Sequence, residues 1–147
     1  MSGDLLLKVE LRSDPSMLCV VRGAMERLTE TFGFSPAECR SVTRAVDEAI
    51  TNIMRHSYKG QLDRPIEMLC QRVPKRLGTG EGFEVLLADQ GPAVGPSKLR
   101  GRHLDEIKPG GLGLHFIRQS MDVVEFKRTG GANQLRLVKY LQPEKQD

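Results

Sequence analysis

Apolar and polar residues alternate at the start of the chain and then change to a helical period. On residues 5–11 every second side chain, from Leu5 to Leu11, is apolar, which predicts a half-buried strand. Two segments with apolar residues at helical spacing follow, at 15–32 and 36–56. Each begins with an N-cap residue and a proline, so the pattern predicts two helices in succession.

The second half of the chain predicts mainly strands. Residues 91–111 interrupt the pattern, because they hold three prolines and five glycines and show no periodicity. A loop of this length inside a compact domain is uncommon and is usually functional or mobile. The elements expected around it are strands 66–73 and 83–89, a helix at 112–121, and strands 123–128 and 134–141.

The order of these elements predicts an α+β fold, in which a largely antiparallel sheet is covered by helices on one face. The length of 147 residues suits one domain, residues 1–147. Apolar residues make up 39% of the chain and charged residues 28%, as in ordinary soluble globular proteins.

Composition also limits the partners to be expected. No run approaches the roughly 18 apolar residues of a membrane span, and the N-terminal residues lack the features of a signal peptide. We therefore expect a cytoplasmic protein that does not bind membranes. The net charge of +3 is mild, and the basic stretch 98–108 lacks interleaved aromatic residues, so direct binding to nucleic acid is not expected.

The cysteines and histidines do not form a metal-binding pattern. Cys19, Cys39 and Cys70 are widely spaced and lie in apolar stretches, which is typical of buried free thiols. His103 and His115 have no plausible metal partner nearby in the sequence. A metal site built from these residues is therefore not expected.

Three groups of residues could carry chemistry, and the first lies on the second predicted helix. Glu48, Asn52 and His56 are four residues apart and form a ladder beside the apolar stripe. An asparagine oxygen can hold Mg²⁺, and a glutamate can deprotonate a hydroxyl or a water. Taken alone, the ladder also fits a polar helix edge with local hydrogen bonds.

The second group is Asp89-Gln90-Gly91, at the end of a predicted strand. Asp89 shares a face with the apolar residues of that strand, so its carboxylate points toward the core side and needs a partner. An exocyclic amine such as adenine N6 would suit the carboxylate, and Gly91 would let a flat ring approach the backbone. An ordinary strand-end turn explains the same residues.

The third group, Gly110 to Leu114, joins the long loop to the start of a predicted helix. Unpaired N–H groups and the helix dipole favour phosphate there, and glycines allow a close approach to the anion. The stretch lacks the Lys-Ser/Thr of a Walker A motif. Phosphate binding and a flexible helix entry both remain open for this stretch alone.

Taken in order, the three groups resemble the motifs of the GHKL ATPase superfamily. Glu48-x-x-x-Asn52 resembles its N box, Asp89-x-Gly91 its first glycine box, and 111–113 its second. The small anti-sigma-factor serine kinases are more similar still. Their pattern Glu-Ala-x-Thr-Asn-x-x-x-His appears at 48–56, and their Gly-Leu-Gly-Leu stretch leading into Met-Asp appears at 111–122.

This resemblance implies a role for each group. Asn52 is expected to hold Mg²⁺, Glu48 to act as base toward the hydroxyl being phosphorylated, and Asp89 to bind the adenine amine of ATP. Residues 91–109 are expected to act as an ATP lid. The nucleotide-binding residues implied are Asn52, Arg55, His56, Asp89, Gly91, Gly110, Gly111, Leu112, Gly113 and Leu114.

The resemblance also implies a fold and partners. Members have a two-layer α/β sandwich with a mixed sheet, the Bergerat fold of histidine-kinase-like ATPases. They typically dimerise, bind a sigma factor and phosphorylate a serine on a small anti-sigma antagonist protein. The chain departs from many relatives at Ala93, where their first box has a second glycine.

Two functions follow as hypotheses. The leading one is an ATP-dependent serine/threonine protein kinase and anti-sigma factor. The alternative is a catalytically silent nucleotide-binding module of the same fold that sequesters its partner. An ATPase fragment and a stand-alone histidine-kinase catalytic domain are less favoured.

Overall fold

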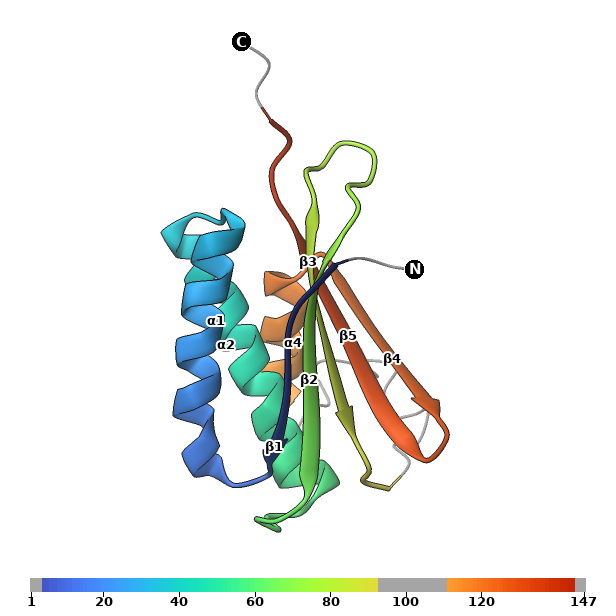
Figure 1. Cartoon of the computed structure of the whole chain (residues 1–147). Helices are drawn as coiled ribbons and strands as arrows, with labels where there is room; N and C mark the ends of the chain where they lie inside the picture. The colour runs from blue at the N-terminus through green and yellow to red at the C-terminus, as the bar shows by residue number, and fades with distance from the viewer. Residues whose placement is uncertain (1–3, 93–110, 145–147) are drawn as a thin grey trace.

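The computed structural model describes residues 4–92 and 111–144, which form a sheet and a layer of helices (Figure 1). In chain order the elements are strand β1 (Asp4–Arg12), 3₁₀ turn η1 (Pro15–Met17), helices α1 (Leu18–Phe32) and α2 (Pro36–Asn52), π-helical turn η2 (Ile53–Ser57), strands β2 (Pro65–Val73) and β3 (Gly82–Asp89), helix α4 (Gly111–Ser120), and strands β4 (Val123–Thr129) and β5 (Ala132–Tyr140). The α+β fold class is confirmed.

The five strands form one sheet in the order β1-β2-β3-β5-β4. Every pairing between neighbours is antiparallel, so the mixed pairing that the resemblance implied is absent from the described strands. For β1 and β2 the reason is that α1 and α2 follow one another and return the chain to the end of the sheet where it left β1. Strands β3 and β4 run in the same direction, but β5 lies between them.

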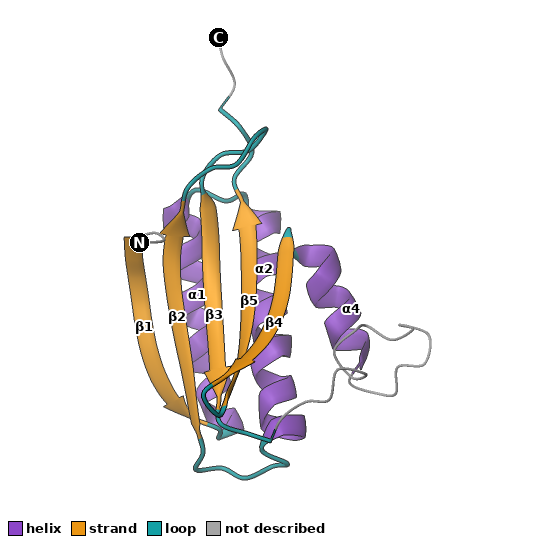
Figure 2. Cartoon of the chain, turned by 90° about the vertical axis from the view of Figure 1, so that its right-hand side faces the viewer, coloured by secondary structure: helices purple, strands orange, loops and turns teal. Residues whose placement is uncertain are grey.

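All the described helices lie against one face of the sheet, and the other face is open toward the viewer in Figure 2. Helix α2 packs against both α1 and α4. The core lies between the two layers, where alternate strand residues meet the apolar stripe of α2. Its fully buried side chains include Val42, Val46, Ile50, Ile66, Met68, Phe83, Val85 and Leu87.

Both predicted helix starts are confirmed by their caps. The Asp14 carboxylate accepts a hydrogen bond from the Ser16 N–H before α1. The Ser35 hydroxyl and the Glu38 side chain form a reciprocal capping box at the start of α2, with distances of 3.2 and 3.0 Å. Gly33 ends α1 with a φ of +116°, a conformation that favours glycine.

Two expectations about single side chains are wrong. Leu5 is 59% exposed, because a register shift between Leu5 and Leu7 turns it to the open face opposite Gln71. Cys19 is exposed near the start of α1, whereas Cys70 is buried as expected. Among the described residues, no helix has both the length and the apolar character needed to cross a membrane.

Candidate functional site

Helix α2 presents Glu48 and Asn52 on the flank that faces α4. That flank is identified by Arg44, whose guanidinium lies 4.2 Å from the centre of the Phe116 ring of α4. Glu48 follows Arg44 by one turn and Asn52 by two, so the three share one side of the helix. Both side chains are half-buried, and neither has a hydrogen-bond or ion-pair partner among the described residues.

The opposite flank of α2 has a different role. Asp47 forms an ion pair with Arg22 of α1, with 2.8 Å between Oδ1 and Nε. This pair and its hydrogen bond raise the pKa of the Arg22 guanidinium above its ordinary value. Asp47 therefore connects α1 and α2, whereas its neighbour Glu48 lies on the flank that faces α4.

Helix α4 begins at Gly111 and runs in the opposite direction to α2 (Figure 2). Its N-terminus therefore lies toward the end of the molecule where α2 finishes, and its first N–H groups have no partners within the helix. Residues 111–114 form the first turn of this helix, not a loop leading into it. Gly110 and most of the expected lid, 93–109, lie outside the described residues.

The last turn of α2 widens into the π-helical segment η2, which carries Arg55 and His56 exposed to solvent. Such segments are rare and frequently occur at functional sites. Tyr58 follows it directly. The Tyr58 hydroxyl accepts a hydrogen bond from the Gln90 N–H at 2.7 Å and donates one to the Pro65 carbonyl.

These two hydrogen bonds join the end of η2 to the residue that follows β3 and to Pro65, the first residue of β2. Burial raises the pKa of the Tyr58 hydroxyl, which keeps its proton available for the Pro65 carbonyl. Gly91 packs against Ser57 at the same junction, where a Cβ on Gly91 would lie 2.8 Å from the Ser57 Cβ. These contacts hold the Asp89-Gln90-Gly91 group against the end of the helical segment that carries Glu48, Asn52 and His56.

Asp89 is only 5% exposed at the end of β3, on the core side as expected. Its Oδ1 atom accepts hydrogen bonds from the Gly91 N–H at 2.9 Å and from the Asn133 side-chain amide at 3.0 Å. A carboxylate has about four acceptor positions. The described residues use Oδ1 alone, so Oδ2 is available to an external donor such as an amine.

Residues 11–139 match the family model described as the histidine kinase-like ATPase domain. The chain belongs to this family. Membership implies an ATP-binding domain, and it confirms the resemblance drawn from the three groups of residues.

Relatives of this histidine kinase-like ATPase domain include named protein kinases. The serine-protein kinase RsbW of Bacillus pumilus is 25% identical over 151 residues, covering 97% of this chain and 90% of that protein. The serine/threonine-protein kinase BtrW of Bordetella bronchiseptica is 28% identical over 108 residues, covering 71% of this chain and 72% of that protein.

Solved structures share the fold. A chain of the SiaB–SiaC complex from Pseudomonas aeruginosa matches with a TM-score of 0.61 at 15% identity, covering 93% of this chain and 91% of that chain. A Mycobacterium tuberculosis chain with RsbU and RsbW domains matches with a TM-score of 0.64 at 12% identity. The match covers 94% of this chain and 34% of that longer chain.

Two residues beside Asp89 in this ATPase domain were missed by the sequence reasoning. Asn133 of β5 lies opposite Asp89 in the sheet, and Arg128 of β4 lies opposite Asn133. The Arg128 guanidinium donates to the Asn133 side-chain oxygen and to the Gly91 carbonyl, both at 3.0 Å. The signal that could have found them is the Gly130-Gly131 hairpin turn, which sets their register.

The predicted residues therefore fall into two sets. Glu48, Asn52, Asp89 and Gly91 lie on elements that meet at one end of the molecule, and Gly111 to Leu114 form the first turn of the adjoining helix α4. Arg55 and His56 lie on the exposed turn beyond Asn52. No cluster of His, Cys, Asp and Glu among the described residues could hold a metal ion.

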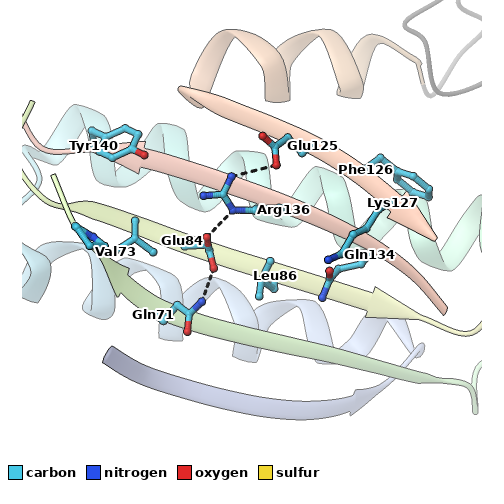
Figure 3. A pocket seen from close by; sticks show the side chains of 11 residues that line it. Gln71, Val73, Glu84, Leu86, Glu125, Phe126, Lys127, Gln134, Arg136 and Tyr140 are labelled. Carbon is cyan, nitrogen blue, oxygen red and sulfur yellow. Dashed lines mark hydrogen bonds and ion pairs between the residues drawn. The ribbon is translucent and has the colours of Figure 1, made fainter. Parts of the chain in front are cut away.

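A separate hollow of about 510 Å³ lies on the open face of the sheet, away from these residues (Figure 3). A row of polar side chains crosses four strands there. Glu84, which is 3% exposed, accepts hydrogen bonds from Gln71 and from Arg136, and Arg136 also pairs with Glu125 at 3.1 Å. Together these carboxylates raise the pKa of Arg136 against the opposing effect of burial.

Proposed function

We propose that this chain is an ATP-dependent serine/threonine protein kinase and anti-sigma factor. It phosphorylates a small anti-sigma antagonist protein and sequesters a sigma factor, as a single cytoplasmic domain, 1–147, that forms a homodimer. The kinase names of its relatives support the reaction class. The antagonist, the sigma factor and the dimer follow from the resemblance to anti-sigma-factor serine kinases.

The observation that carries the proposal is the flank of α2 that faces α4. Glu48 and Asn52 are half-buried there, one turn apart, and have no partner among the described residues. A half-buried carboxylate without a partner costs free energy unless a ligand or water satisfies it. Such a pair beside a helix N-terminus is suited to a phosphorylated ligand.

In the proposed reaction the γ-phosphoryl group of ATP is transferred to a serine hydroxyl, and Glu48 acts as the base. The oxygen of the substrate serine forms a bond to the γ-phosphorus of ATP, while the bond from that phosphorus to the β,γ-bridging oxygen breaks and ADP leaves. Glu48 accepts the proton of the serine hydroxyl. Glu48 is the catalytic residue of this proposal, because it alone touches the reacting hydroxyl.

The residues present fit Mg²⁺ as the accompanying ion. Mg²⁺ prefers oxygen ligands, keeps several waters and is usually shared between one or two side chains and the substrate phosphates. The free amide oxygen of Asn52 suits that coordination. When bound, the ion neutralises charge on the phosphates.

Nucleotide binding is assigned to the three groups together. Asp89 accepts from the adenine amine through its free oxygen, and Gly91 keeps the adjoining backbone close to Ser57. Arg55 and His56 lie toward the phosphates. The phosphates are bound by Gly110 together with Gly111, Leu112, Gly113 and Leu114, of which the last four form the first turn of α4.

A phosphotransfer assay tests the proposal. The purified chain is incubated with Mg²⁺, γ-labelled ATP and each candidate antagonist protein of its organism. We expect Glu48→Gln to abolish labelling of serine while ATP binding persists, because the amide cannot accept the proton. Asp47→Asn is the matched control, since it makes the same type of change on the flank facing α1, and it should retain labelling.

Two outcomes distinguish the alternatives. If no antagonist is labelled and Glu48→Gln behaves as the wild type does, the kinase assignment is wrong. If the chain still captures its partner in that case, and Asn52→Ala captures it equally well, the catalytically silent sequestering module is supported.

A further inference from the structure

Three residues form a row across three adjacent strands beside the proposed adenine site. Asn133 of β5 is paired with Asp89 of β3 on one side and with Arg128 of β4 on the other. All three side chains interact on the helix-covered side of the sheet, and Asn133 is 1% exposed. The row ends at Asp89, the carboxylate that binds the adenine ring in the proposed function.

Arg128 and the acceptors around the amide nitrogen together determine which way the Asn133 amide points. A guanidinium can only donate hydrogen bonds, so the atom 3.0 Å from Arg128 Nη1 is the amide oxygen. The amide nitrogen is then directed at Asp89 Oδ1, at 3.0 Å. A flip of the amide would place oxygen against oxygen at Asp89 and remove one of the two acceptors that Arg128 has among the described residues.

The same amide nitrogen fixes the turn that follows Asp89. It lies 3.3 Å from the Gly91 carbonyl and 3.1 Å from the Pro92 carbonyl, and Arg128 donates to the Gly91 carbonyl as well. Asp89 Oδ1 also accepts from the Gly91 N–H. The carboxylate is therefore held at one oxygen by two donors, with its plane fixed and Oδ2 left for a ligand.

We propose that Asn133, oriented by Arg128, is a positioning residue that sets the purine selectivity of this site. The inference rests on the proposed function, because it takes Asp89 as the base-binding carboxylate. A fixed acceptor at Oδ2 suits the 6-amino group of adenine and repels the 6-oxo group of guanine. A carboxylate free to rotate could instead accept from guanine N1–H and its 2-amino group.

The test compares the dissociation constants of ATP and GTP, measured by calorimetry on the intact chain. Asn133→Leu is nearly isosteric and removes the donor to Asp89. We expect it to lower the preference for ATP over GTP by at least about tenfold, as loss of a hydrogen bond to a charged group does. Gln134→Leu is the matched control, because the next side chain lies on the open face.

Two changes at Arg128 separate positioning from folding. Arg128→Met removes the donor that holds the Asn133 amide oxygen and should lower the same preference, whereas Arg128→Lys keeps a donor and should stay closer to the wild type. A purely structural role would reduce the folded fraction, which thermal unfolding measures, and would weaken ATP and GTP equally. The ratio of the two constants would then not change.

Several results would overturn the inference. A folded Asn133→Leu with an unchanged ratio would do so, as would an equal loss in Gln134→Leu, and in both cases the proposed function would stand. If Asn133→Leu does not fold, an unchanged ratio in Arg128→Met has the same meaning. A wild type that binds neither nucleotide would overturn the proposed function and this inference together.

Discussion

Gly91 lies between the buried end of β3 and Ser57, the last residue of η2. A Cβ added to Gly91 would lie 2.8 Å from the Ser57 Cβ and 3.0 Å from the Ser57 carbonyl oxygen. No real Cβ tolerates both contacts, so the backbone or the helix end has to move. The close approach of the Gly91 main chain to Ser57 therefore holds the turn after Asp89 against the end of η2.

Gly91→Ala should therefore destabilise the fold by about 1–3 kcal/mol, as overpacking does, and weaken ATP binding. Gly23→Ala is the matched control, because Gly23 is exposed in α1 with nothing within 4 Å of an added Cβ. It should stabilise the fold by about 0.5–1 kcal/mol. Urea unfolding of both variants checks the pair, and equal effects would contradict the packing at Ser57.

Cys70 predicts a pH dependence of stability. Burial raises the pKa of its thiol to about 12 in the folded chain, against 9.0 without burial. Between these values the folded state binds more protons than the unfolded state, so the free energy of unfolding falls as pH rises through this window. The contribution of Cys70 to the free energy of unfolding should be about 1.4 kcal/mol lower at pH 10 than at pH 8.

Urea unfolding at pH 8 and pH 10 measures this difference in the wild type and in Cys70→Ala. The variant has no thiol to ionise, so its stability should fall by less over the same interval. An identical fall in both proteins would show that other groups carry the whole pH dependence.

At the scale of elements, the local signals of the sequence proved reliable. Caps at Asp14 and Ser35 mark the two helix starts, and Gly33 marks a helix end, because each acts through neighbours in the chain. The π-helical turn η2 was not predicted. Its surroundings include the contacts of Ser57 and Tyr58 with the end of β3, which is distant in sequence.

Ser35→Ala should lower stability by about 1 kcal/mol, because it removes the side chain that caps the Glu38 N–H. Helix α2 begins at this cap and carries Glu48, so the loss of the cap destabilises the helix that holds the proposed site. Ser16→Ala is a suitable control, since its backbone N–H still donates to Asp14, and its effect should stay within about 0.5 kcal/mol. Chemical denaturation distinguishes the two, and equal losses would argue against the capping box.

At the scale of the whole molecule, the proposed site and the open sheet face are separate regions. Strand alternation assigns Glu84 to the polar side of β3, but it does not predict that Gln71 and Arg136 bury it. The same limit applies to Asn133 and Arg128, whose roles depend on which strands become neighbours. The sequence predicts residues that share an element far better than residues that meet across a sheet.

Glu84→Gln should lower stability by about 1–2 kcal/mol, because it weakens a buried pair whose arginine is partly exposed and keeps Glu125. ATP affinity should not change, since the site lies on the helix side. Glu125→Gln, at a side chain that is 63% exposed, should cost less than about 0.5 kcal/mol. A changed dissociation constant for ATP in Glu84→Gln would contradict the separation of the two faces.

The proposed function requires the flank of α2 that faces α4 to bind Mg-ATP. Calorimetry of ATP and ADP with Mg²⁺ on the wild type and on Asn52→Ala tests it most directly. We expect the wild type to bind ATP, and we expect the loss of the Asn52 oxygen to weaken Mg-ATP binding by about tenfold or more. No binding by the wild type would contradict the kinase proposal and leave an ATPase-family fold used for protein capture alone.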